Sequence, residues 1–212
     1  MPRSFKFLTA TLLTAAVVLA ACSNLPDATS TPASAYQVDT AQSSVQFVTT
    51  KAGQPGVGGI SEVQSFKRYS GGMTADGRVS FDIDLASVDT GVGIRDERMR
   101  TMLFMVQASP QARFTAQIDA AVARALPAAA FSDIELKGNL ALAGQTRPVD
   151  AKLRITRLAG GALQVATRAP IVVDANQYGM KAGVEALREV MGLNFLASVA
   201  PVSFTLVLNA QR

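Results

Sequence analysis

Residues 87–104 hold the densest group of side chains that could do chemistry in this chain, with three carboxylates and three arginines among them. Paired carboxylates can act as general acid and base, and arginines can hold an anionic group. However, Asp96 and Glu97 are adjacent, and adjacent residues on a helix do not face each other. Asp96 is instead well spaced to pair with Arg100 on a helix surface. The segment therefore predicts a corner between a strand and a helix rather than an active site.

The residue types that most catalytic and metal sites require are missing. The chain has no histidine, so a Ser–His or Cys–His pair cannot form and a zinc or copper site lacks its usual ligands. Asp82 and Asp84 alternate with apolar residues, which predicts charges on the outer face of a strand. The net charge of +4, the scattered basic residues and the absence of tryptophan give no reason to expect nucleic acid. We expect no catalytic residue, no metal and no cofactor.

The amino terminus is typical of an export signal. Arg3 and Lys6 precede an uncharged run over residues 7–21 that is too short to span a bilayer. The run ends in Leu19-Ala20-Ala21-Cys22, which resembles the lipobox of bacterial lipoproteins, in which the cysteine is acylated and becomes the first residue. The resemblance implies a signal peptide over residues 1–21 and a lipid anchor on Cys22, the only cysteine. An ordinary signal peptide that ends near Ala21 is the alternative.

The residue after the cysteine and the segment that follows indicate where the protein is held. Ser23, rather than an aspartate, follows Cys22, which in bacterial lipoproteins implies the outer membrane, facing the periplasm. The rest of residues 22–34 contains two prolines and little that could be buried, so we expect a flexible tether there. Residues 35–212 are then enough for one domain with a well-buried core.

Alternation of apolar and polar residues predicts an all-β domain. In residues 78–85, for example, every second residue is apolar, which gives a strand with one dry face. The pattern predicts about eight strands, within residues 36–47, 60–66, 78–85, 114–118, 134–142, 149–155, 163–171 and 202–208. Short turns between them favour antiparallel neighbours. Two short helices are expected, within residues 94–106 and 183–191. The predicted fold is an antiparallel, lipocalin-like barrel of about eight strands, with a two-sheet sandwich as the alternative.

Several motifs resemble the YceI-like lipid/polyisoprenoid-binding family over about residues 36–209. The strongest is Ser87-Val88-Asp89-Thr90-Gly91 followed by Arg95-Asp96. Weaker pieces come in the family's order: Tyr36-Gln37-Val38-Asp39, Ser44-Val45-Gln46-Phe47, Ser70-Gly71, Gly138-Asn139-Leu140 and Tyr178-Gly179. The resemblance implies a barrel whose apolar interior takes an extended isoprenoid chain. The chain departs from many members at Gln42-Ser43 and at Arg98-Met99, because those members carry a histidine there.

The inward positions of the strands and one face of each helix are the candidate ligand-binding residues. Spacing i, i+3, i+4 places Met99, Met102 and Leu103 on one helix face, which packs in the core or lines a cavity. Arg95, Arg98 and Tyr178 are candidates for contacting a polar head group, and the alternative for the arginines is a strand-end carboxylate such as Asp89. The predicted cavity residues are Phe47, Phe81, Ile83, Met99, Met102, Leu103, Phe114, Leu140, Leu153, Val165, Leu187 and Phe204.

The predicted function is an envelope lipoprotein that binds or carries an isoprenoid-type lipid, such as a polyprenol or a quinone, without catalysis. Its partners would be that lipid and, through acylated Cys22, the membrane; the sequence is also compatible with a homodimer. The alternative is a structural or protein-interaction module of the cell envelope whose barrel is filled by its own side chains. An open interior would favour the first function, and side chains meeting from opposite walls would favour the second.

Overall fold

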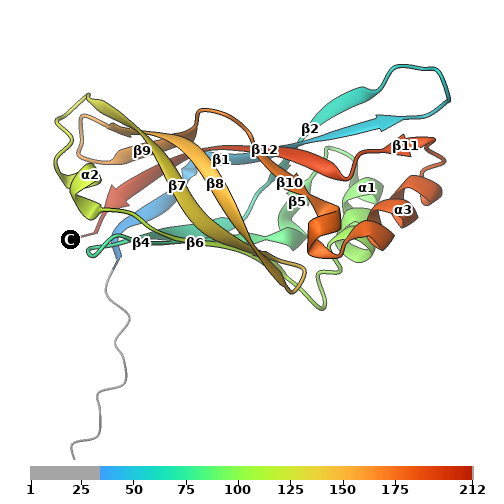
Figure 1. Cartoon of the computed structure of the whole chain (residues 1–212), viewed down its shortest axis with the longest axis horizontal. Coiled ribbons are helices and arrows are strands. Elements are labelled where there is room, and N and C mark those ends of the chain that lie inside the picture. The colour runs from blue at the N-terminus through green and yellow to red at the C-terminus, as the bar shows by residue number, and fades with distance from the viewer. Residues whose placement is uncertain (1–33, 212) are drawn as a thin grey trace, which may run out of the picture. The chain divides into compact units, whose positions relative to one another are not determined.

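The protein is represented by a computed structural model, which describes residues 34–211 (Figure 1). The predicted signal peptide, Cys22 and the tether up to residue 33 lie outside the described residues. No helix in residues 34–211 is long and apolar enough to cross a membrane. The elements, in chain order, are β1 (Ser34–Ala52), β2 (Ile60–Phe66), β3 (Tyr69–Thr74), β4 (Arg78–Asp84), the 3₁₀ turn η1 (Leu85–Ser87), β5 (Val88–Asp89), α1 (Gly93–Arg98), the π-helical turn η2 (Met99–Leu103), β6 (Gln111–Gln117), α2 (Ala120–Arg124), β7 (Phe131–Leu142), β8 (Gln145–Arg157), β9 (Leu163–Thr167), β10 (Ile171–Asp174), the 3₁₀ turn η3 (Ala175–Tyr178), α3 (Lys181–Val190), β11 (Phe195–Leu196) and β12 (Val199–Ala210).

Eight of these strands form a closed antiparallel barrel, which confirms the predicted fold class. Neighbouring strands around the barrel follow the order β12-β9-β8-β7-β6-β4-β3-β1. The ring closes because β1 also pairs with β12, from Tyr36 opposite Ala210 to Phe47 opposite Val202. Strands β2, β5, β10 and β11 extend this sheet beyond the ring. A two-sheet sandwich lacks such a closing pair, so the alternative fold is wrong.

Strand β4 illustrates how alternation gives the barrel a dry interior. Phe81 and Ile83 border the interior, and Phe81 lies directly opposite Phe114 of β6. Asp82, between them, lies on the outer face and forms an ion pair with Arg113, with 2.5 Å between Oδ1 and Nε. Because side chains alternate along a strand, the apolar half of β4 faces inward and the charged half faces solvent.

One barrel strand was not predicted, and barrel strand β9 was predicted as one strand with β10, which lies outside the ring. Strand β3 was not predicted, because Gly71 and Gly72 interrupt its apolar pattern. A Cβ on Gly72 would overlap the backbone oxygen of Tyr36, so these glycines let β3 lie close to its neighbours. The single strand expected over residues 163–171 is instead β9 and β10, separated by a segment that includes Pro170. Proline lacks the N–H that a continuous ladder needs.

The turn-prone residues near the start of β1 form a bulge within one continuous strand. The register against β12 shifts between Asp39 and Ser44. Within the bulge, Asp39 Oδ1 accepts a hydrogen bond from the backbone N–H of Ala41 at 3.0 Å, and Ser43 Oγ donates to the Asp39 carbonyl at 2.6 Å. Side chains thus satisfy backbone groups that the ladder leaves free, and the strand continues past the bend.

Helices cover both ends of the barrel (Figure 1). At one end α1, η2 and α3 lie together. The absence of a side chain on Gly183 lets α3 approach η2 closely, since a Cβ there would lie only 2.6 Å from the carbonyl oxygen of Met102. At the other end lies the short helix α2, which was not expected from the sequence pattern. Arg157 of β8 holds this end closed, since its guanidinium donates to the carbonyl oxygens of Leu126 at 2.7 Å and Gly161 at 3.0 Å, and to that of Ala123.

Candidate ligand-binding cavity

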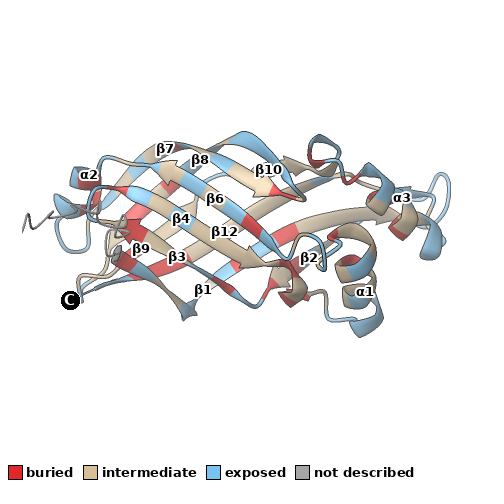
Figure 2. Cartoon of the chain, turned by 90° about the horizontal axis from the view of Figure 1, so that it is seen from below, coloured by how far each residue is buried: buried red, intermediate tan, exposed pale blue. Residues whose placement is uncertain are grey.

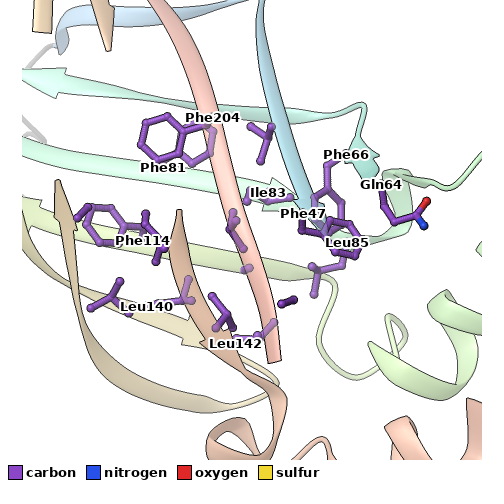
Figure 3. Close-up of a pocket in the computed structure, with 18 of the residues that line it drawn as sticks. Phe47, Gln64, Phe66, Phe81, Ile83, Leu85, Phe114, Leu140, Leu142 and Phe204 are labelled. Atoms are coloured by element: carbon purple, nitrogen blue, oxygen red, sulfur yellow. The ribbon is translucent and has the colours of Figure 1, made fainter. Parts of the chain in front are cut away.

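The barrel encloses an apolar cavity of about 300 Å³. Side chains from all eight barrel strands and from the helices border it, and the labelled residues in Figure 3 surround a common space. Phe81, Phe114 and Phe204 point inward and yet remain only half-buried, because they border this space. Much of the barrel wall is intermediate in exposure (Figure 2).

The size of the cavity argues against a barrel filled by its own side chains. An engineered apolar cavity of about 150 Å³ stays dry and binds small apolar molecules, and this one has about twice that volume. The cavity is therefore suited to hold an apolar guest.

The structure places eleven of the twelve predicted cavity residues in the cavity wall, and Met102 is the exception. The reason is the π-helical turn η2, in which the N–H of Phe104 bonds the carbonyl of Met99 five residues earlier. This wider turn keeps Leu103 near Met99 on the cavity side and rotates Met102 away. Met102 packs against the hydrophobic core instead.

At the end near α1, the hairpin of β1 and β2 changes the cavity wall from apolar to polar. Residues that lie directly opposite each other in an antiparallel pair share a face. Along the inward face, Phe47 lies opposite Gln64 and Thr49 lies opposite Glu62. The apolar side is continued by Phe66, whose ring centroid lies 5.1 Å from that of Phe47. Among the labelled side chains in Figure 3, only Gln64 carries nitrogen and oxygen, and it lies at one end of the group.

A carboxylate and two cations form the outer part of this polar end. Glu62 Oε2 lies 2.7 Å from Lys51 Nζ and 2.7 Å from Arg95 Nη1. The hydrogen bond from Lys51, together with the charge of Arg95, lowers the pKa of Glu62, although partial burial acts in the opposite direction. The side chains of Lys51 and Glu62 border the cavity and remain 22% and 34% exposed, so the cavity reaches the surface beside them.

Two buried polar atoms at this end have no hydrogen-bond partner among the described residues: Gln64 Oε1 and Arg95 Nε. Gln64 is only 2% exposed, and its Nε2 donates to Thr49 Oγ1 at 3.1 Å. Arg95 uses its other nitrogens, with Nη1 on Glu62 and Nη2 on the Thr90 carbonyl at 2.6 Å. A buried polar group without a partner typically costs about 1–3 kcal/mol. An unpaired acceptor and an unpaired donor beside a cavity indicate a place where a polar group of a ligand can bind.

Of the three head-group candidates, only Arg95 borders the cavity. Arg98 is half-buried outside the cavity wall, and Tyr178 is 3% exposed within the hydrophobic core, where burial raises its pKa. The suggested partner Asp89 does not bind either arginine, because it forms an ion pair with Lys67 at 2.9 Å. These placements make Arg95 the one candidate that a guest in the cavity could reach.

The predicted pair of Asp96 and Arg100 is wrong. Asp96 Oδ1 accepts hydrogen bonds from the backbone N–H and the hydroxyl of Thr90, at 2.8 and 2.6 Å. Arg100 binds Glu97 instead, with 3.0 Å between Nη2 and Oε2. Asp96 thus stabilises the turn that leads into α1, which positions Arg95 over the cavity.

The polar wall residues Thr49, Lys51, Glu62 and Gln64 are not among the cavity residues predicted from the sequence. The alternation of side chains along a strand could have identified them, because they occupy every second position from Phe47 and Phe66 and so share the inward face. They were overlooked because polar side chains are normally assigned to the solvent face of a strand. Within residues 34–211 no group of three or more His, Cys, Asp or Glu side chains could hold a metal ion.

Comparison with known proteins gives a family and relatives that match most of this chain. The YceI-like domain profile matches residues 36–207. A protein of Shewanella denitrificans named UPF0312 protein is 30% identical over 151 residues, which cover 69% of this chain and 71% of that protein. A polyisoprenoid binding domain from Saccharophagus degradans, implicated in plant cell wall breakdown, is 31% identical with a TM-score of 0.79, over 84% of this chain and 100% of that one. Burkholderia cenocepacia BcnA, 19% identical over 80% of this chain and 98% of its own, shares the fold with a TM-score of 0.56.

Proposed function

Since this chain belongs to the YceI-like domain family, we propose that it binds an isoprenoid-type lipid, such as a polyprenol or a polyprenyl quinone, inside its barrel. The observation that carries the proposal is the apolar cavity of about 300 Å³ with a polar end. The polyisoprenoid binding of the Saccharophagus domain supports it. The family comprises binding domains rather than enzymes, so the bound lipid is held and released unchanged.

The energetics of burial favour a carrier over a permanent store. Each methylene moved from water into the cavity gains about 0.8 kcal/mol. A lipid bilayer offers nearly the same gain, so the net affinity measured against a membrane is small. Selectivity then depends on the shape of the cavity and on the polar groups at its end. A domain of this kind takes up a lipid from a nearby membrane and can deliver it to another acceptor.

The test is lipid uptake by the delipidated, full-length chain. We expect native mass spectrometry to detect a polyprenol or a polyprenyl quinone bound to protein extracted from its own membrane, and the same lipid to rebind after delipidation. An unbranched alcohol of equal carbon number serves as the control for cavity shape, and we expect it to bind more weakly. Absence of a co-purifying lipid, together with absence of uptake in vitro, would contradict the proposal.

We also propose that the mature protein is anchored to the outer membrane, facing the periplasm, through acyl chains on Cys22. Two or more acyl chains give stable attachment, whereas a single chain binds only reversibly. We therefore expect Cys22→Ala to move the protein into the soluble periplasmic fraction, measured by fractionation and immunoblotting. The variant Ser23→Ala is the control and is expected to stay with the membrane. A Cys22→Ala protein that remains fully membrane-bound would exclude this anchor.

A further inference from the structure

We propose that the polar end of the cavity recognises a hydroxyl head group, so that the protein prefers a polyprenol or a reduced quinol to a head group that only accepts hydrogen bonds. The inference rests on the proposed function and concerns the site formed by Gln64, Thr49 and Arg95. It does not depend on the length of the isoprenoid chain, which the apolar part of the cavity holds.

Gln64 is a buried residue of the cavity wall. It is among the largest fully buried side chains of the described residues, and it lies on β2 between Glu62 and Phe66 on the inward face. Its amide donates to Thr49, which fixes the side chain and leaves Oε1 without a donor. A buried amide in a folded protein normally uses both its donor and its acceptor atoms. Oε1 is therefore able to accept a hydrogen bond from a donor group of a ligand.

Arg95 supplies the complementary atom. Its Nη1 and Nη2 are engaged by Glu62 and by the Thr90 carbonyl, which leaves the N–H on Nε as a free donor within residues 34–211. Its charge is already balanced by Glu62, which also accepts from Lys51. The end of the cavity thus offers one acceptor and one donor, beside a group of Lys51, Arg95 and Glu62 whose net charge is +1.

A hydroxyl suits either atom, since its hydrogen can be donated to Gln64 Oε1 and its oxygen can accept from Arg95 Nε. A quinone carbonyl or an ether oxygen only accepts, and would leave Gln64 Oε1 unpaired. A fully ionised phosphate head group also only accepts, so it would leave Gln64 Oε1 unpaired even though the net charge of Lys51, Arg95 and Glu62 would attract it. Sites with a buried polar group discriminate strongly against a ligand that leaves this group unpaired.

The test compares three ligands with the same chain, farnesol, farnesal and farnesyl methyl ether, by isothermal titration calorimetry on the delipidated protein. We expect farnesol to bind about tenfold more tightly than the ether and the aldehyde. Equal binding of all three would overturn the hydroxyl preference and leave the proposed function intact. Tighter binding of farnesal would mean that the amide presents its NH₂ group, which also overturns the preference. Failure of all three to bind would instead count against the proposed function.

A variant pair assigns the preference to Gln64. We expect Gln64→Leu to bind farnesol about as weakly as the ether, with the affinity for the ether unchanged. Gln46→Leu makes the same substitution at an exposed position on β1 and should keep the full preference. A Gln64→Leu protein that still prefers farnesol by the original factor would contradict the role of this residue. The ligand comparison in the unmodified protein stands without any variant, so a folding defect in Gln64→Leu does not leave the proposal untested.

Discussion

Val165→Trp is expected to abolish most lipid binding while the barrel stays folded. Val165 lies on β9, opposite Ile155 of β8 and Leu206 of β12, and borders the cavity. It packs against both hydrophobic clusters of the core, which places it along the middle of the interior. An indole ring there occupies the space of the guest. Overpacking a filled core costs about 1–3 kcal/mol, but here the cavity receives the ring, so we expect a smaller cost in stability and a fall in affinity of at least about tenfold.

The substitution also reports where the new side chain lies. The chain has no tryptophan, so the emission maximum of the variant shows whether its indole is in an apolar surrounding. Ala166→Trp, the next residue on β9, points to the outer face and is the matched control, with red-shifted emission and normal lipid binding. A Val165→Trp protein with blue-shifted emission and unchanged affinity would mean that the lipid binds outside the barrel.

Gly72→Ala is expected to lower the free energy of unfolding by roughly 3 kcal/mol or more, a large share of the 5–15 kcal/mol of a typical domain. Gly72 lies opposite Gln37 of β1 and Ser80 of β4. A Cβ there would overlap the carbonyl oxygen of Tyr36, which is backbone within the ladder and cannot rotate away. The methyl group must therefore separate β1 from β3 and weaken the barrel wall on that side.

Urea denaturation followed by circular dichroism measures this effect. Gly160→Ala is the control, because a Cβ at Gly160 meets nothing within 4 Å and its backbone is not in the left-handed region. We expect the control to stay within about 0.5 kcal/mol of the unmodified protein. A loss below about 1 kcal/mol in Gly72→Ala would show that β1 and β3 separate more easily than their close approach implies.

The barrel was predictable because its signal is repeated in many strands. In β4 every inward residue is apolar and the residues between are polar, and a strand with one dry face must close or stack against another. No local sequence pattern predicts that the barrel closes, because the closing strands β1 and β12 lie far apart in the sequence. Strand β3 was missed for a different reason: its glycines are required by the backbone spacing and carry no hydrophobic pattern.

The candidate site was predictable only in its apolar part. Phe81, Phe114 and Phe204 follow the rule that apolar residues face inward, and they border the cavity. Gln64 and Glu62 break this rule, because the end of the barrel holds polar groups on the inward face. Sites that bind ligands are where such exceptions are expected, since a hydrogen-bonding group has to be placed inside. Only their positions in the alternation of side chains along β2 distinguish Gln64 and Glu62 from surface residues.

The pairing of β1 with β12 has a consequence for how the molecule folds. Asn209 Nδ2 donates to Asp39 Oδ2 at 3.1 Å across 170 residues of chain, and Val207 N donates to Ser43 Oγ at 2.9 Å. Contacts between such distant residues slow folding, because the loop between them must be closed before they form. Among the described strands β1 comes first and β12 last, so one edge of β1 stays unpaired until β12 is in place. An unpaired edge invites association with other chains. The pairing of β12 with β1 therefore protects the protein against aggregation as well as closing the barrel.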